Sequence, residues 1–173
     1  NCRLAAKELD VPIGILADLP GPKYRIGDFK EKAITVPTGN DFIFSSDFVD
    51  ANIPTINIWP DGFSRDIRKG AKILIDEGSI EMRVTEIDGD NVRCKVTSGG
   101  LIKSNKSITS PGHTSRVDYF SPETIKAIEF VKSSDVDFVG LSYIRNSKDL
   151  IDVKKKLGSK VDRVRLVAKI EIR

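Results

Sequence analysis

The hydrophobic pattern of this chain changes its period along the sequence, and this constrains the fold more than any other feature. Residues 13–19 (IGILADL) form a nearly continuous apolar run, typical of a strand buried on both faces. Between residues 30 and 109 apolar and polar residues alternate, as in 80–85 and 92–97, with the turn sequence DGDN at 88–91 between those two runs. After residue 112 helix and strand patterns return. The chain is therefore predicted to be an α/β scaffold interrupted by an all-β insert.

The last third of the chain predicts alternating helices and strands. The sequence SPE at 121–123 is a helix start signal, with a capping serine, a proline in the first turn and an acid favoured by the helix dipole. The inner face of this helix is predicted to hold Ile125, Ile128 and Val131. A strand at 137–143, a helix capped by Ser147 and ended by Gly158, and a strand at 164–170 follow. This succession favours a right-handed parallel βαβ unit.

Composition argues against several classes of protein. Lys and Arg number 28 against 25 Asp and Glu, and both are interleaved, so no nucleic-acid partner is expected. Cys2 and Cys94 lie far apart beside a single histidine, which favours neither a disulfide framework nor a zinc site and fits a reducing cytoplasm. No apolar stretch approaches the roughly 20 residues of a membrane span, so no membrane partner is expected. Because the chain starts without methionine and stops just after a strand, we expect a piece of a longer protein.

Two short runs far apart in the sequence, ADLPGPKYRIG at 17–27 and VAKIE at 167–171, each end an apolar strand with charged residues. Parallel α/β architectures keep their chemistry at such strand ends, so a site is predicted there. Together with KILIDEGSI at 72–80, SGG at 98–100, Lys106, PG at 111–112 and the segment 135–145, these runs resemble pyruvate kinase in order and spacing.

The resemblance covers nearly all of the chain and implies an α/β fold. This fold would be a partial (β/α)₈ TIM barrel, about strands 3–5, with an inserted all-β small barrel that serves as a lid domain. Residues 1–28 would supply a helix end, the third strand and a hinge, residues 29–115 the lid, and residues 116–173 the fourth and fifth strands. The first two strands, the last three and the family's regulatory domain fall outside the resemblance, so the isolated chain is expected to be inactive.

The resemblance implies phosphoryl transfer from phosphoenolpyruvate to ADP, giving pyruvate and ATP in glycolysis. It further implies Mg²⁺ or Mn²⁺, a cytoplasmic location and a homo-oligomeric parent protein. Positioned charge carries most of the catalysis in such reactions. Lys169 and Glu171 suit this role because, two residues apart on a strand, they would point to the same side, the ammonium toward the phosphoryl group and the carboxylate toward the metal. A surface ion pair is the alternative for these two residues.

The family's motifs also assign residues to the nucleotide. Arg25 matches a hinge arginine that reaches nucleotide phosphates, which suits its planar fork, although a pair with Asp28 is the alternative. Asp76 and Lys106 match lid positions that approach the nucleotide on closure, and a solvated loop lysine is the alternative for Lys106. Catalytic roles are thereby implied for Arg25, Lys106 and Lys169.

One departure from the family pattern concerns a monovalent cation. Asp18 matches a residue that helps to hold K⁺, and an unpaired carboxylate there would be costly unless it met a cation. Many family members continue with TKGPE, whereas this chain has LPGPK, so the acid that accompanies K⁺ is replaced by Lys23. We expect Lys23 to substitute for the ion and the enzyme to be K⁺-independent, unless Lys23 simply faces solvent.

Ser142 lies near the end of the predicted strand at 137–143 and has two possible roles. It either lines the substrate pocket or merely caps a strand end.

Two further functions from other classes stay open. The first is a non-catalytic protein, similar to pyruvate kinase, that senses a nucleotide or a phosphometabolite. The second is a stand-alone β module that binds another macromolecule, with the flanking segments as scaffold. Fold similarity alone does not separate these from the enzyme.

Overall fold

The structure is a computed structural model and describes residues 2–29, 33–46 and 53–171. The chain divides into two compact units, the first made of Asn1–Pro22 with Asp118–Ile172 and the second of Lys23–Val117. The sequence placed the corresponding boundaries after residues 28 and 115. Residues 30–32 and 47–52 of the predicted β insert lie outside the described residues.

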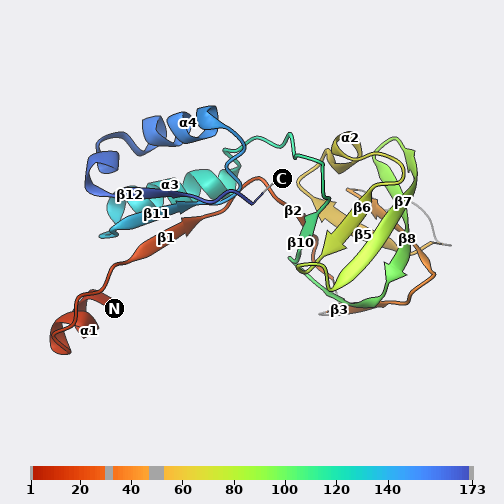
Figure 1. Ribbon diagram of the computed structural model, residues 1–173, viewed down its shortest axis with the longest axis horizontal. Helices are drawn as coiled ribbons and strands as arrows, with labels where there is room; N and C mark the ends of the chain where they lie inside the picture. Colours follow the sequence, from red (N-terminus) through yellow and green to blue (C-terminus); the bar gives the residue numbers. More distant parts are fainter. Residues whose placement is uncertain (1, 30–32, 47–52, 172–173) are drawn as a thin grey trace. The chain divides into compact units, whose positions relative to one another are not determined.

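The second unit contains a closed β-barrel, which confirms the predicted small all-β barrel (Figure 1). Its strands follow the order β10-β2-β5-β4-β8-β7-β6. Their bounds are β2 Tyr24–Ile26, β4 Asp41–Ser45, β5 Thr55–Trp59, β6 Lys72–Ile75, β7 Ile80–Asp88, β8 Asn91–Ser98 and β10 Ser107–Thr109. Strand β3 (Ala33–Val36) pairs with β9 (Gly100–Lys103), and the short helix α2 spans Phe63–Asp66.

The alternation of apolar residues fixes the barrel. Strand β7 buries Ile80, Met82 and Val84, and the antiparallel strand β8 buries Val92, Cys94 and Val96. A slip by one residue would turn all of these side chains outward, so burial specifies the register. The predicted DGDN turn joins the two strands, with Gly89 at φ 56°, a left-handed conformation that glycine adopts readily.

The first unit is built on a parallel sheet in the order β1-β11-β12. Its strands span Leu16–Leu19, Phe138–Leu141 and Arg165–Ala168, with helices α3 (Pro122–Ser133) and α4 (Ser147–Leu157) in the connections. The helix α1 spans Cys2–Glu8, and the 3₁₀ helix η1 spans Gly158–Arg163. Strands β11 and β12 pair in parallel, as the predicted βαβ unit requires. The strands are aligned so that Leu19, Leu141 and Ala168 lie side by side.

The expectation that the run 13–19 is buried on both faces is wrong for the described residues. Strand β1 begins only at Leu16, whose exposed fraction is 50%, and Ile13 before it is also exposed. Leu19 is the buried residue of this strand. Because β1 is an edge strand of the three-stranded sheet, fewer neighbouring elements cover it than cover the central strand β11.

Both helices in the connections differ in detail from their predictions. Helix α3 buries Thr124 together with Ile128 and Val131, whereas Ile125 is exposed, because positions four and three residues apart share one face. Ser121 caps this helix as predicted. The cap of α4 is Asn146 instead of Ser147, since the Asn146 side chain accepts a hydrogen bond from a backbone N–H inside the first turn.

Candidate functional site

An ammonium group lies among oxygen atoms at the carboxyl end of the parallel sheet. Lys169 Nζ is 2.9 and 3.1 Å from the two carboxylate oxygens of Asp18 and 3.0 Å from Ser142 Oγ. The same ammonium is 3.4 Å from Glu171 Oε1. Ser142 Oγ in turn donates to Asp18 Oδ1 at 3.3 Å. We call Asp18, Ser142, Lys169 and Glu171 the strand-end cluster.

Strand register explains why residues distant in sequence meet here. Asp18 is the penultimate residue of β1, while Ser142 and Lys169 directly follow β11 and β12. Because parallel neighbours end at one edge, the side chains at or just past their ends come together. The Lys169 side chain is 34% exposed and that of Asp18 is 53% exposed, so solvent reaches the pair.

The charges of the cluster stabilise its lysine as a cation. The hydrogen bond to Asp18 raises the pKa of Lys169, burial opposes this, and Glu171 adds a further increase. Lys169 therefore stays protonated at neutral pH and provides a fixed positive charge. An oxyanion brought to this edge would meet that charge already in place.

A tight turn holds Ser142 in the cluster. Tyr143, the next residue, adopts a left-handed φ of 58°, and the buried Tyr119 hydroxyl donates to the Ser142 carbonyl at 3.1 Å. A Cβ atom on Gly21 would collide with that carbonyl oxygen, so glycine is required for the close approach. Ser142 therefore stands directly after β11 with its hydroxyl in contact with both Asp18 and Lys169.

The sequence prediction for Lys169 and Glu171 needs one correction. Strand β12 ends at Ala168, so the two residues lie just beyond the strand and not on it. Their charged groups are nevertheless neighbours. Within the first unit Asp18 pairs with an ammonium of the chain itself, that of Lys169, and the sequence motifs did not predict this pairing. The sequence feature that could have predicted this pair is that Asp18 and Lys169 both lie at the ends of strands expected to be parallel.

The other predicted residues belong to the second unit. Lys106 Nζ lies 2.8 Å from Asp76 Oδ1, and each side chain is 37% exposed, so Lys106 is held by an ion pair. Arg25 Nη1 donates to the Asn105 carbonyl oxygen at 3.0 Å, and the Asn105 amide donates to Asp28. Arg25 is thus linked to Asp28 through Asn105.

Backbone pairing brings the Arg25 and Lys106 segments together. Arg25 in β2 pairs with Ser107 in β10, and the Ile26 N–H donates to the Lys106 carbonyl at 2.9 Å. Lys23 also lies in this unit, whereas Asp18 lies in the first. We call Arg25, Asp76 and Lys106 the barrel cluster.

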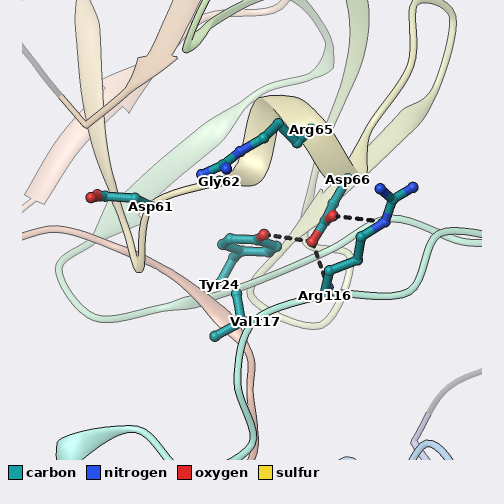
Figure 2. A pocket seen from close by; sticks show the side chains of 7 residues that line it. All are labelled: Tyr24, Asp61, Gly62, Arg65, Asp66, Arg116 and Val117. Atoms are coloured by element: carbon teal, nitrogen blue, oxygen red, sulfur yellow. Dashed lines mark hydrogen bonds and ion pairs between the residues drawn. The ribbon is translucent and has the colours of Figure 1, made fainter.

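A separate pocket of about 230 Å³ lies in the second unit (Figure 2). Its lining consists of Tyr24, Asp61, Gly62, Arg65, Asp66, Arg116 and Val117. None of the residues that the sequence assigned to chemistry belongs to this lining. The pocket is therefore distinct from the barrel cluster.

The donor set gives a partial fit to a divalent metal. Within the described residues, no group of three or more His, Cys, Asp or Glu side chains is placed to hold a metal ion. Mg²⁺ usually keeps several waters and takes one or two carboxylates together with substrate phosphates. Glu171 fits as one such carboxylate.

Among the described helices none has the length and apolarity to cross a bilayer.

Comparisons with known proteins agree with the sequence motifs. The family model described as pyruvate kinase, barrel domain, matches residues 1–173. Pyruvate kinase of Corynebacterium efficiens is 33% identical over 159 residues, which is 92% of this chain and 34% of that protein. Pyruvate kinase 2 of a Synechocystis species is 33% identical over 173 residues, covering 98% of this chain and 29% of that protein.

A third relative is the pyruvate kinase of Thermococcus litoralis, which is 31% identical over 169 residues, covering 98% of this chain and 36% of that protein. The chain thus spans about a third of the length of the curated relatives it matches. Together with the family model, these matches show that this chain belongs to the pyruvate kinase family.

Proposed function

We propose that the protein carrying this chain transfers a phosphoryl group from phosphoenolpyruvate to ADP. The P–O bond of phosphoenolpyruvate breaks, a β-phosphate oxygen of ADP bonds to phosphorus, and the released enolate takes up a proton to become pyruvate. The observation that carries the proposal is the fixed ammonium of Lys169 among Asp18, Ser142 and Glu171 at aligned strand ends. Family membership supports the reaction class.

Lys169 acts in this proposal on the charge that develops during transfer. The phosphoryl group in flight and the enolate oxygen are both negative, so a cation that is already oriented stabilises them without reorganisation. Asp18 and Ser142 hold the ammonium in position. Glu171 would hold Mg²⁺ or Mn²⁺, which when bound neutralises phosphate charge. In this role Ser142 borders the substrate site.

The barrel cluster serves the nucleotide. Arg25 and Lys106 present positive groups on neighbouring segments, and the ion pair with Asp76 holds the Lys106 side chain in place. The barrel is proposed to be the family's lid, and the first unit to supply strands 3–5 of a (β/α)₈ barrel. Because the remaining strands lie outside this chain, the isolated chain is proposed to be inactive.

The proposed enzyme does not require K⁺. The residue at position 23 is a lysine where the acid of the K⁺ site would be expected, and Asp18 already pairs with an ammonium. Assays of the whole protein with and without K⁺ test this point. Equal activity is expected, and Lys23→Glu is expected to create a K⁺ requirement. A strict requirement in the unmodified protein would end the proposal for Lys23.

The reaction itself is tested with the whole protein, phosphoenolpyruvate, ADP and Mg²⁺. Pyruvate and ATP should appear in equal amounts, and Lys169→Met should slow their formation by about 10²–10³-fold. Lys126→Met, on the exposed side of helix α3, is the matched control and should leave turnover unchanged. Binding of ADP without any turnover would instead favour the nucleotide-sensing alternative.

A further inference from the structure

The carboxylate of Asp66 is the most buried acidic group near the points where the chain enters and leaves the second unit. Its side chain is only 6% exposed. Tyr24 Oη donates to Asp66 Oδ2 at 2.6 Å, and the Arg116 backbone N–H donates to the same oxygen at 2.7 Å. The Arg116 guanidinium adds a contact from Nε to Oδ1 at 3.5 Å. Figure 2 shows the three groups at one end of the pocket.

The two donors lie beside the two points where the chain passes between the units, at residues 22–23 and 117–118, which we call the two connections. Tyr24 is the second residue of the second unit, and Arg116 is the last but one. Residues 24 and 116 are far apart in sequence and are joined here through one side chain of helix α2. Burying a carboxylate is costly unless it is well hydrogen-bonded. Moving either connection away from the barrel would remove one of these hydrogen bonds and leave the buried Asp66 carboxylate less well satisfied.

Tyr24 also links Asp66 to the barrel cluster, because Arg25 is the next residue in the chain. Its ring packs edge-on against Phe63 at 5.1 Å between centroids, and its backbone begins strand β2. The Arg25 side chain lies on the other face of that strand, and Arg25 pairs with Ser107 of the neighbouring strand β10. Burial and the hydrogen bond to Asp66 raise the pKa of Tyr24, so the hydroxyl remains a donor at neutral pH.

We propose that Asp66 is a positioning residue that fastens both connections to the barrel and thereby fixes the place of Arg25. Residues 24 and 116 then move with the barrel, and bending between the units is confined to the backbone outside them. The effect on Arg25 rests on the proposed function, because it is read through the nucleotide. The fastening of the connections does not depend on it.

Amide hydrogen exchange of the whole protein tests the fastening. In Asp66→Ala the Arg116 N–H loses its acceptor, and its exchange should quicken by about tenfold or more, the worth of a hydrogen bond to a charged group. Asp61→Ala is the matched control, because Asp61 lines the same pocket but its carboxylate is exposed. Unchanged protection at Arg116 in folded Asp66→Ala would overturn the proposal.

Kinetics test the consequence for the nucleotide. Tyr24→Phe keeps the ring packing and removes only the hydroxyl, so it remains informative if Asp66→Ala does not fold. KM for ADP should rise about three- to tenfold in Tyr24→Phe with KM for phosphoenolpyruvate unchanged. An equal rise in both KM values, or none, would refute the positioning of Arg25. A wild-type protein without turnover would instead refute the proposed function, while the exchange result still decides the fastening.

Discussion

Replacing Lys169 by Met should separate catalysis from stability. The ion pair with Asp18 is partly solvated, since the two side chains are 34% and 53% exposed. Such pairs contribute up to about 1 kcal/mol to folding, because water screens the charges and solvates the partner that remains. Ser142 keeps its hydrogen bond to Asp18. The free energy of unfolding should therefore fall by no more than about 1 kcal/mol.

The effect on turnover should be much larger. Removing one preoriented group that stabilises developing charge lowers kcat by about 10²–10³, equivalent to about 3–4 kcal/mol of transition-state stabilisation. The loss exceeds the stability change because the ammonium meets more negative charge in the transition state than in the free protein. Lys169 is thus expected to be expendable for folding and essential for transfer.

Two measurements on the same preparation check this prediction. Urea unfolding followed by circular dichroism gives stability, and pyruvate formation per folded molecule gives turnover. A stability loss above about 2 kcal/mol, beyond the range of exposed pairs, or turnover near that of Lys126→Met would refute the reasoning.

Three other changes have expected outcomes. Burial opposes ionisation of Asp149, but the hydrogen bonds from Arg145 outweigh burial and lower the pKa of Asp149. The ionised Asp149 therefore stabilises the folded protein at neutral pH, and this contribution is lost as the pH falls through the folded pKa. Asp149→Asn should therefore cost most stability in urea titrations at pH 7 and progressively less as the pH falls below the ordinary pKa of an aspartate, and a cost that does not change with pH would contradict this. Gly21→Ala should reduce the free energy of unfolding by about 1–3 kcal/mol and also reduce turnover, because the new Cβ meets the Ser142 carbonyl. If stability and turnover were both unchanged, the close approach of Gly21 would not be needed to hold Ser142 in place. Phe44→Ala, at a fully buried barrel position, should lower the unfolding free energy by about 3–5 kcal/mol in urea melts, and a loss under about 1 kcal/mol would mean that the core refills the space.

Local sequence patterns predicted much of the fold because they act over short distances. The alternation in 80–97 and the turn at 88–91 agree with hairpin β7–β8, and Gly158 follows helix α4 as expected. Where local signals competed, the sequence was ambiguous. Asn146 and Ser147 are both good caps, and the backbone geometry at Asn146 selected the first.

The sequence by itself determined which residues carry charge at strand ends, because the change from apolar to polar residues marks where a strand leaves the core. Only the tertiary structure decided that Lys169 meets Asp18, 151 residues away, and that Ser142 lies between them. The same holds for Asp66, whose two donors come from opposite ends of the barrel segment. Such pairings depend on the register of neighbouring strands and on burial of a polar group, which arise only when distant segments pack together.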